Sequence, residues 1–499
     1  MRARKSLVAF LSDYLKAGIG FVTVFFVTRL IGAEAIGIVA YHLSLLGLFS
    51  FFLDIGISTA HIKRVSEKND LGRCVGTYLF LKITALLIYL GIIIIYLYFF
   101  SGLHLTSPGH AIKDARIFII LLCYYLFDQF TSVLTATFSA REEVVKLNLP
   151  MILGRSGKMV VVMTLGFLGW GGIGLAISYC VDSLLSFGLS VILFKKAHIP
   201  VKKPDFEMIK SYWKYALPMM FIIPVSVLLS NVDRVMIQRL SNSTQVGFYY
   251  SVQSLLGIIN SISSSAMIVL LPKISADFSM GKITELKTSI YKAVRYLAVL
   301  MMGLFAIMNV QADWIVQICF GKEFLATSAI LQWMLLTYLI ATVARPYSNI
   351  LYGIEKHRGV AKISILNLLL LITCNWWLIP KMGASGAAIS NVVIWVFSGS
   401  AQVFLAHRYL QLSMNGRRVL NMIVSCFLTW LATLFSRFMV LKFLPIHLVF
   451  QLMIVSAFGI SAYILILTML GEWQKADWVY VRRILNPSEA KKDFVREFR

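Results

Sequence analysis

Ten ionisable residues interrupt otherwise apolar stretches of the sequence, and they are the groups best placed to do chemistry. An ionisable group at the centre of a bilayer costs at least ~2.5 kcal/mol, so each is expected to face a partner or a water-filled cavity. Their pattern indicates ion pairing, or the binding of a charged substrate or coupling ion within a membrane. These residues are Asp13, Lys16, Asp54, Asp128, Arg155, Lys158, Asp182, Asp233, Arg234 and Arg345.

The most demanding of these groups are Arg155 and Lys158. They are three residues apart and therefore share a helical face. Two cations on one face near the middle of a bilayer need anions opposite them. Either Asp128 and Asp182 supply these anions in a structural ion network, or the two cations also face an anionic ligand.

Asp13 and Lys16 have the same spacing and can neutralise each other. Arg345 stands just before Pro346, which frees a backbone carbonyl about one turn earlier. Arg345 either stabilises a local kink there or binds diphosphate oxygens, which suit its planar fork of donors.

Asp54 and Asp233 leave two interpretations open. They either bind a coupling proton or cation, or pair with Arg64 and Arg234. No second carboxylate stands at helix-neighbour spacing from either one, so the sequence does not define a dedicated cation site.

The elements that position these groups are membrane-spanning helices. Of the 499 residues, 59% are hydrophobic and 14% are charged, whereas a soluble domain carries roughly 25% charged residues. Uncharged stretches such as residues 83–112 and 382–407 are long enough to cross a ~30 Å hydrocarbon core. The composition excludes a soluble globular protein and predicts an all-α, polytopic membrane protein.

Apolar runs and their interruptions predict about fourteen transmembrane helices. An even number places both termini on the same side, and basic residues concentrate in alternate loops. The positive-inside rule then predicts a multi-pass protein of the cytoplasmic membrane with both termini in the cytoplasm. The predicted spans are 7–30, 36–60, 75–99, 115–139, 147–169, 172–194, 215–239, 247–271, 291–312, 327–351, 361–380, 383–406, 419–440 and 447–470.

This distribution also explains the net charge of +24. The excess of basic residues mainly sets the orientation of the helices in the membrane, and attraction to anionic membrane lipids is a secondary effect. No nucleic-acid partner is therefore expected. The six cysteines stand singly in or near apolar segments, and histidine and cysteine spacings match no metal site. No phosphate-binding G-x-x-x-x-G-K-[ST] loop occurs. We therefore expect no metal, no cofactor and no catalytic residues.

The sequence matches itself across its two halves. Residues 29–47 align with 239–257 at an offset of 210, and residues 171–178 align with 383–390 at an offset of 212. An offset of six spans keeps the copies in one orientation, which predicts parallel repeats about an axis along the membrane normal. Two such bundles suit alternating access by rocking. The glycines that the matches pair are Gly37 with Gly247, Gly47 with Gly257, Gly171 with Gly383 and Gly174 with Gly386.

The repeat and the loops predict the domain organisation. Pro200 and Pro204 interrupt the longest inner connection, and a short surface helix follows with Phe206, Ile209 and Trp213 on one face. The expected parts are an N-terminal six-helix bundle (1–194), a cytoplasmic linker with a surface helix (195–214), a C-terminal six-helix bundle (215–406), transmembrane helices 13 and 14 (407–470) and a cytoplasmic tail (471–499).

Several short motifs recur around the ends of the predicted helices. They are Arg29-Leu30-Ile31-Gly32 with Gly37, Asp54-Ile55-Gly56, Arg64-Val65-Ser66-Glu67, Asp233-Arg234, Gly247-Phe248-Tyr249 and Gly383-Ala384-Ser385-Gly386-Ala387-Ala388. These motifs resemble those of the polysaccharide exporters, the flippases of lipid-linked oligosaccharides, including O-antigen translocases. This family is part of a superfamily that also contains multidrug/cation antiporters and lipid II flippases. The second half has Ser264 where a counterpart of Asp54 would stand, which argues against a symmetric role for that carboxylate.

The resemblance implies a flippase that moves a polyprenyl-diphosphate-linked oligosaccharide from the inner to the outer leaflet for cell-surface polysaccharide or glycan synthesis. Arg155, Lys158 and Arg345 would attract the lipid diphosphate, with Lys16 and Arg234 as lesser candidates. Further expected partners are a polysaccharide polymerase and glycosyltransferases. An antiporter of organic cations is an alternative, although it would want a net anionic, aromatic-lined cavity. A membrane glycosyltransferase is an alternative of another class, without an evident catalytic site.

The orientation can be tested with single cysteines introduced at Lys203 and Lys322. An impermeant thiol reagent applied to intact cells should label Lys322→Cys and leave Lys203→Cys unlabelled, because basic loops remain cytoplasmic. Permeabilised cells, in which both should react, provide the control. Labelling at position 203 but not at 322 would overturn the orientation.

Overall fold

A computed structural model describes residues 2–100, 108–354, 356–411, 416–444, 446–474 and 477. All regular elements in these ranges are helices, which confirms the all-α prediction. Of the predicted cytoplasmic tail, residues 478–499 lie outside the described residues.

Contacts divide the chain into two compact units. We call them the N-terminal unit and the C-terminal unit after the residues that dominate each one. The predicted division into two six-helix bundles concerns the internal repeat, and it stays a prediction. The N-terminal unit comprises Lys5–Leu255 and Leu368–Ala387, and the C-terminal unit comprises Met1–Arg4, Leu256–Asn367 and Ala388–Arg499.

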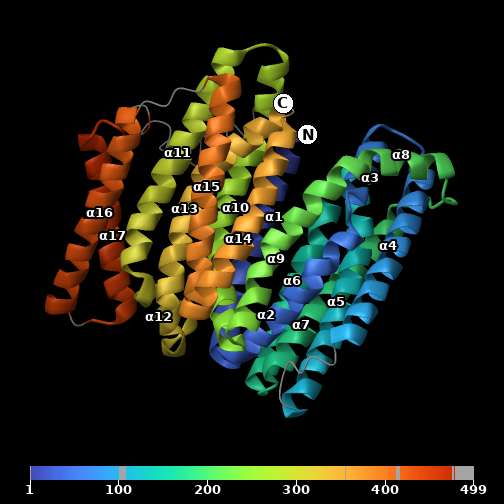
Figure 1. The fold of residues 1–499 in the computed structure, drawn as a ribbon, viewed down its shortest axis with the longest axis horizontal. Helices are drawn as coiled ribbons and strands as arrows, with labels where there is room; N and C mark the ends of the chain where they lie inside the picture. The colour runs from blue at the N-terminus through green and yellow to red at the C-terminus, as the bar shows by residue number, and fades with distance from the viewer. Residues whose placement is uncertain are drawn as a thin grey trace. The chain divides into compact units, whose positions relative to one another are not determined.

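Long helices make up most of the N-terminal unit (Figure 1). Four of its helices, α1, α10, α14 and α15, also have residues in the C-terminal unit. The elements up to α10 are α1 (Arg2–Ile31), α2 (Ala33–Phe49), the 3-10 turn η1 (Ser50–Leu53), α3 (Ile57–Ser66), α4 (Leu71–Phe100), α5 (Pro108–Ala140), α6 (Val144–Phe167), α7 (Gly171–Lys196), α8 (Phe206–Ala216), η2 (Leu217–Phe221), α9 (Ile222–Leu240) and α10 (Ser243–Ser279).

The remaining elements follow in chain order. Helices α16 and α17 lie side by side as a pair (Figure 1). The elements are α11 (Ile283–Val310), α12 (Ala312–Phe320), η3 (Lys322–Thr327), α13 (Ser328–Gly353), α14 (His357–Met382), α15 (Ala384–Leu410), α16 (Gly416–Phe443) and α17 (Leu448–Met469).

A long helix covers most or all of each of the fourteen predicted spans. Among the described residues, eleven of these helices are both long and apolar enough to cross a membrane. Helices α6, α9 and α10 are not among the eleven, so the count of fourteen spans stays a prediction. The protein is a multi-pass membrane protein.

The predicted span 36–60 is wrong in its second part. Helix α2 ends at Phe49, and after η1 the chain turns before α3 begins at Ile57. Gly56 has φ +99°, which favours glycine, and a Cβ there would lie 2.7 Å from Met219 Cβ. Asp54 Oδ1 accepts hydrogen bonds from the backbone N–H groups of Gly56 and Ser58. Asp54 therefore caps the first turn of α3 and the left-handed Gly56 turns the chain before it, so α3 is a separate helix where hydropathy alone continues one span.

The predicted pairing of Gly37 with Gly247 coincides with a close backbone contact. A Cβ on Gly37 would lie 1.7 Å from Ser243 O, and a Cβ on Gly247 would lie 1.8 Å from Ala33 O. Residues 33 and 243 are themselves separated by 210, so the contact is reciprocal, as a two-fold axis between the copies requires. Superposition of the complete halves stays a prediction.

The second repeat match pairs two equivalent turns. Gly171, the first residue of α7, has φ +52°. Gly383, the residue directly before α15, has φ +57°. Both positions use the left-handed backbone that glycine allows without a steric penalty.

The linker between α7 and α8 is held against the start of α4. Lys202 N donates to Gly72 O at 3.0 Å, and Lys202 Nζ lies 2.6 Å from Asp70 Oδ2. The hydrogen bond from Lys202 lowers the pKa of Asp70. A Cβ on Gly76 would lie 1.7 Å from Lys202 O, so the two backbones touch.

Helix α8 forms where the sequence predicts a short helix, and it packs against the protein through Tyr212. Tyr212 is fully buried and its hydroxyl lies 2.9 Å from His61 Nδ1, whereas Phe206 and Trp213 are exposed. Thr137 Oγ1 lies 3.0 Å from the other ring nitrogen of His61. Burial, and next the charge of Lys82, lowers the pKa of His61 to about 3, so this imidazole is neutral at physiological pH.

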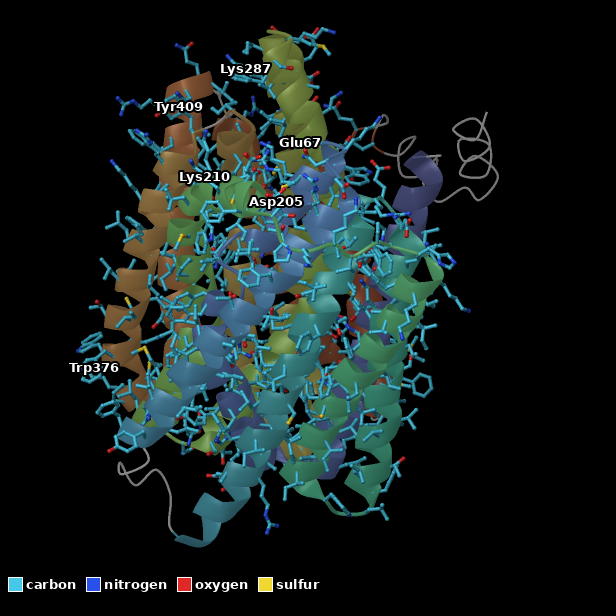
Figure 2. The ribbon with its side chains drawn as sticks, turned by 90° about the vertical axis from the view of Figure 1, so that its right-hand side faces the viewer. Glu67, Asp205, Lys210, Lys287, Trp376 and Tyr409 are labelled. Carbon is cyan, nitrogen blue, oxygen red and sulfur yellow. The ribbon has the colours of Figure 1, made fainter. Side chains whose placement is uncertain are left out.

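Within the N-terminal unit, charged residues mark one end. Glu67, Asp205 and Lys210 lie toward one end, and Trp376 lies toward the other (Figure 2). Residues of the predicted inner loops therefore lie toward the same end of this unit, and which side of the membrane that end faces stays a prediction.

We expect Gly37→Ala to destabilise the protein, because its methyl group would collide with a backbone carbonyl that cannot move alone. Overpacking of this kind costs roughly 1–3 kcal/mol. A melting assay in detergent measures the effect.

Gly91→Ala is the matched control, since nothing lies within 4 Å of a Cβ at that position of α4. Alanine favours a helix by up to ~1 kcal/mol relative to glycine, so this variant should melt at the same temperature or higher. Equal melting of the two variants would contradict the close contact.

Candidate functional site

Arg155 and Lys158 lie near the middle of α6, which has 24 residues. Arg155 is exposed, and its Nη1 donates to the backbone carbonyl of Lys16 at 3.2 Å. Among the described residues, no carboxylate oxygen lies within 4 Å of either cation. Both therefore keep their charge available to a ligand.

Lys158 lies over an aromatic ring. Its Nζ is 3.0 Å from the centroid of the Tyr179 ring, a cation–π contact. The Tyr179 hydroxyl is hydrogen-bonded to the Tyr250 hydroxyl at 2.5 Å, and we call these two residues the tyrosine pair. The Arg234 guanidinium carbon lies 5.7 Å from the Tyr250 ring. Two of the predicted substrate-binding cations, far apart in sequence, thus meet around the tyrosine pair.

The sequence analysis missed the tyrosine pair. One signal was available, because Tyr179 stands three residues before Asp182 and therefore on the same face of α7. No comparable signal marks Tyr250, which lies 71 residues further along the chain and reaches Tyr179 only through the fold.

The two candidate counter-anions come close to α6 without pairing directly. A Cβ on Gly154 would lie 2.3 Å from Asp182 Oδ1, so Asp182 packs against the residue before Arg155. Asp182 interacts electrostatically with Lys158 and Arg155, and Asp128 interacts with Asp182. These interactions are longer than ion pairs. Among the described residues, the anions balance the cations at a distance, and of the two cations Arg155 is exposed.

Asp13 and Lys16 form the ion pair that their spacing predicts, with Lys16 Nζ 2.7 Å from Asp13 Oδ1. Lys16 Nζ also donates to Asn148 Oδ1 at 2.9 Å, and its side chain is largely buried. Lys16 is thus already engaged by two groups, which makes it a weaker candidate for substrate than Arg155.

Asp54 pairs with a cation that the sequence analysis did not single out. Lys82 Nζ lies 3.2 Å from Asp54 Oδ2, donates to Leu53 O at 3.0 Å and is only 5% exposed. Arg64, the partner considered from sequence, pairs with Glu67 at 2.8 Å instead. Lys82 lies within a long apolar run, which is the signal that could have identified it as a buried charge.

Asp233 is buried in the N-terminal unit. Its oxygens accept hydrogen bonds from Tyr249 Oη and from Asn375 Nδ2, each at 2.7 Å. Arg234, the next residue, donates to Ser230 O at 2.8 Å and to Asn231 Oδ1 at 3.2 Å. Two neutral donors thus contact this buried carboxylate.

Arg345 belongs to the C-terminal unit, whereas the other candidate residues belong to the N-terminal unit. Helix α13 continues through Pro346, and the Arg345 guanidinium carbon lies 6.0 Å from the Trp395 ring. The sequence-predicted site residues therefore gather in one unit, with Arg345 as the exception.

Comparison with known proteins places these features in context. Residues 3–278 match the family described as polysaccharide biosynthesis protein. The chain is 23% identical over 398 residues to a probable low-salt glycan biosynthesis flippase, Agl15, of Haloferax volcanii, covering 78% of this chain and 80% of that protein.

Solved structures of two transporters share the fold. The lipid II flippase MurJ in an inward closed conformation has a TM-score of 0.74 at 16% identity, covering 93% of this chain and 98% of MurJ. An inward-facing multidrug resistance transporter of the MATE family has a TM-score of 0.66 at 14% identity, covering 81% and 98%. At these identities the likeness shows the fold alone.

The Asp54–Lys82 pair predicts an asymmetric mutational effect. Asp54→Asn should destabilise the protein by about 2–4 kcal/mol, because it leaves a buried ammonium group without its carboxylate. Lys82→Met should cost less, since Asp54 is 35% exposed and keeps two backbone donors.

The double variant should recover most of the lost stability. Lys63→Met, which breaks the exposed 3.9 Å pair with Glu67, is the control and should change stability by under about 0.5 kcal/mol. Thermal melting of purified protein in detergent measures all four variants. Equal costs for Asp54→Asn and Lys63→Met would refute the buried pair.

Proposed function

The chain belongs to the polysaccharide biosynthesis protein family, and on this basis we propose that it is a flippase for a lipid-linked glycan. Its substrate is a polyprenyl-diphosphate-linked oligosaccharide, which it moves from the inner to the outer leaflet of the cytoplasmic membrane by alternating access. Both termini are cytoplasmic in this proposal. The name of the Haloferax volcanii relative, a glycan biosynthesis flippase, supports the same class of substrate.

The observation that carries the proposal is the state of the α6 cations. A transmembrane helix does not keep an exposed arginine near its middle against lipid, because the charge needs water or an anion. Arg155 is exposed and Lys158 is balanced by carboxylates only at a distance. An anionic headgroup entering the membrane interior supplies the missing charge.

The groups divide the work by their chemistry. Arg155 and Arg345 present planar forks of donors that suit diphosphate oxygens, and Lys158 adds a compact charge. Lys16 and Arg234 attract the diphosphate through their electrostatic field more than through direct contact, because both side chains are already hydrogen-bonded to neighbouring groups. The hydroxyls of the tyrosine pair suit sugar hydroxyls, and the lipid tail remains in the bilayer.

The remaining carboxylates are candidates for coupling to an ion. Asp13 and Asp54 already have lysine partners, so we assign them to ion pairing. Asp128, Asp182 and Asp233 are the candidates for a coupling proton or cation, since uptake of positive charge there would change the field at the α6 cations.

The site argues against the antiporter alternative. An organic cation would bind against an aromatic face, but Lys158 already covers the face of Tyr179 at 3.0 Å. A site whose aromatic surface is occupied by a cation attracts anions. The polysaccharide polymerase and glycosyltransferases that make and use the glycan are the proposed functional partners.

Charge-neutralising variants test the assignment. Arg155→Gln, Lys158→Gln and Arg345→Gln should each slow translocation of a lipid-diphosphate-linked oligosaccharide in proteoliposomes. Loss of a charge-assisted hydrogen bond worth roughly 1.5–3 kcal/mol corresponds to about 10- to 100-fold. Arg155→Lys should keep part of the activity, because it retains the charge without the fork.

Lys146→Gln is the matched control on α6, since Lys146 pairs with Glu143 near the end of the helix. Melting of the same variants separates transport from stability: a purely structural role would lower the melting temperature together with transport. Full transport in all three Gln variants would remove the diphosphate assignment.

A further inference from the structure

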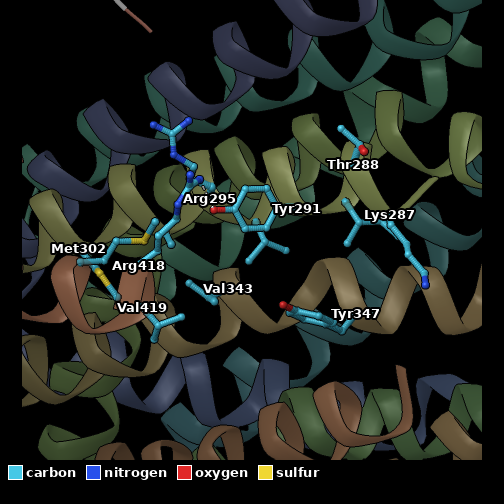
Figure 3. Close-up of a pocket in the computed structure, with 13 residues that line it drawn as sticks. Lys287, Thr288, Tyr291, Arg295, Met302, Val343, Tyr347, Arg418 and Val419 are labelled. Atoms are coloured by element: carbon cyan, nitrogen blue, oxygen red, sulfur yellow. Dashed lines mark hydrogen bonds between the residues drawn. The ribbon is translucent and has the colours of Figure 1, made fainter. Parts of the chain in front are cut away.

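The C-terminal unit contains an elongated cavity of about 290 Å³ that plays no part in the proposed translocation site. It lies between α11, α13 and α16 (Figure 3). Its inner part is apolar, lined by Val294, Ala298 and Met302 of α11 together with Val343 and Met422. A cavity of this lining takes a hydrocarbon chain rather than a polar ligand.

Three cations stand around the other part of the cavity. Figure 3 shows Tyr291 between Lys287 on one side and Arg295 with Arg418 on the other. Arg295 is neutralised by Asp477, with Nη2 2.6 Å from Oδ2. Arg418 donates to the hydroxyl of Tyr291 at 2.8 Å, a neutral partner.

The charge at this end is therefore positive. Among the described residues, no carboxylate oxygen lies within 4 Å of Lys287 or Arg418. Two uncompensated cations beside a neutral hydroxyl donor form a binding place for a phosphate group.

The arrangement has the dimensions of one lipid chain in one leaflet. The apolar part runs from Val294 to Met302, which spans about 12 Å along α11 at ~1.5 Å per residue. One leaflet contributes about 15 Å of a ~30 Å hydrocarbon core. Arg418 is the third residue of α16, so it lies where that helix leaves the interface.

We propose that this cavity binds one anionic phospholipid, with an acyl chain along Val294, Ala298 and Met302 and its anionic headgroup between Lys287 and Arg418, which lie on either side of Tyr291. Basic pockets between transmembrane helices recognise anionic headgroups, and here the apolar extension adds a chain to the recognition. The site is separate from the translocated substrate, because its residues are not those proposed to hold the diphosphate.

Native mass spectrometry of the full chain in detergent tests the proposal. The wild-type protein should retain one phosphatidylglycerol in preference to phosphatidylcholine with the same chains. Lys287→Gln/Arg418→Gln should reduce retained phosphatidylglycerol at least tenfold. Val419→Trp, which fills the cavity from its lining, should do the same without removing a charge.

Arg358→Gln/Lys362→Gln is the matched control, because it removes two exposed cations from α14 in the same unit. It should leave binding within twofold of wild type. Should the Lys287/Arg418 variant fail to fold, Val419→Trp carries the test alone.

Equal retention of the two lipids, or no effect of Val419→Trp, would overturn the proposal. Absence of phosphatidylglycerol from the wild-type protein would do so too, as expected if the chain's own residues 478–499 filled the cavity. If millimolar inorganic phosphate abolishes the binding of phosphatidylglycerol, the cations bind free phosphate instead, and the proposed lipid site is wrong.

Discussion

The structure depends on one constraint: a charge within a bilayer has to be neutralised or hydrogen-bonded by other groups of the protein. The protein stabilises its charges in three ways. Asp13 with Lys16 and Asp54 with Lys82 are direct ion pairs. Asp233 is solvated by neutral donors. The α6 cations are balanced only at a distance, which makes them the groups whose electrostatic balance a ligand can complete.

These three electrostatic arrangements suit different roles in a protein that changes conformation. A direct pair has a fixed geometry and resists rearrangement, so it suits the permanent packing of one bundle. A charge balanced at a distance tolerates both the presence and the absence of a ligand. Alternating access needs such a charge, because the site must be stable when empty and when occupied.

The sequence predicted features that depend on local spacing. The helices and the Asp13–Lys16 pair follow from periodicity and an i,i+3 spacing, and the internal offset paired Gly37 with Gly247, where the structure has a close contact. The match of Gly171 with Gly383 likewise identified two turns with the same backbone conformation. Each of these is decided within a few residues or by comparison of the chain with itself.

Contacts between segments that are distant in the chain could not be predicted from the sequence. Lys82 meets Asp54 only because α4 packs against the turn after α2, and Tyr250 meets Tyr179 only through the fold. The break between α2 and α3 was also missed, because hydropathy does not register the turn at Gly56 or the carboxylate of Asp54 that caps α3. Spacing arguments thus predicted which charges were candidates but not which partners hold them.

The clamped linker has a consequence for how the protein sits in its membrane. Lys202 lies against Gly72 and Gly76, and Tyr212 is locked to His61, so α8 cannot rise or sink relative to the ends of α3 and α4. The exposed Phe206 and Trp213 are then held at a constant height on the bundle. On the membrane surface, where the sequence predicts α8 to lie, such an amphipathic helix would fix the immersion depth of the bundle, and a bilayer of unsuitable thickness would have to deform around it.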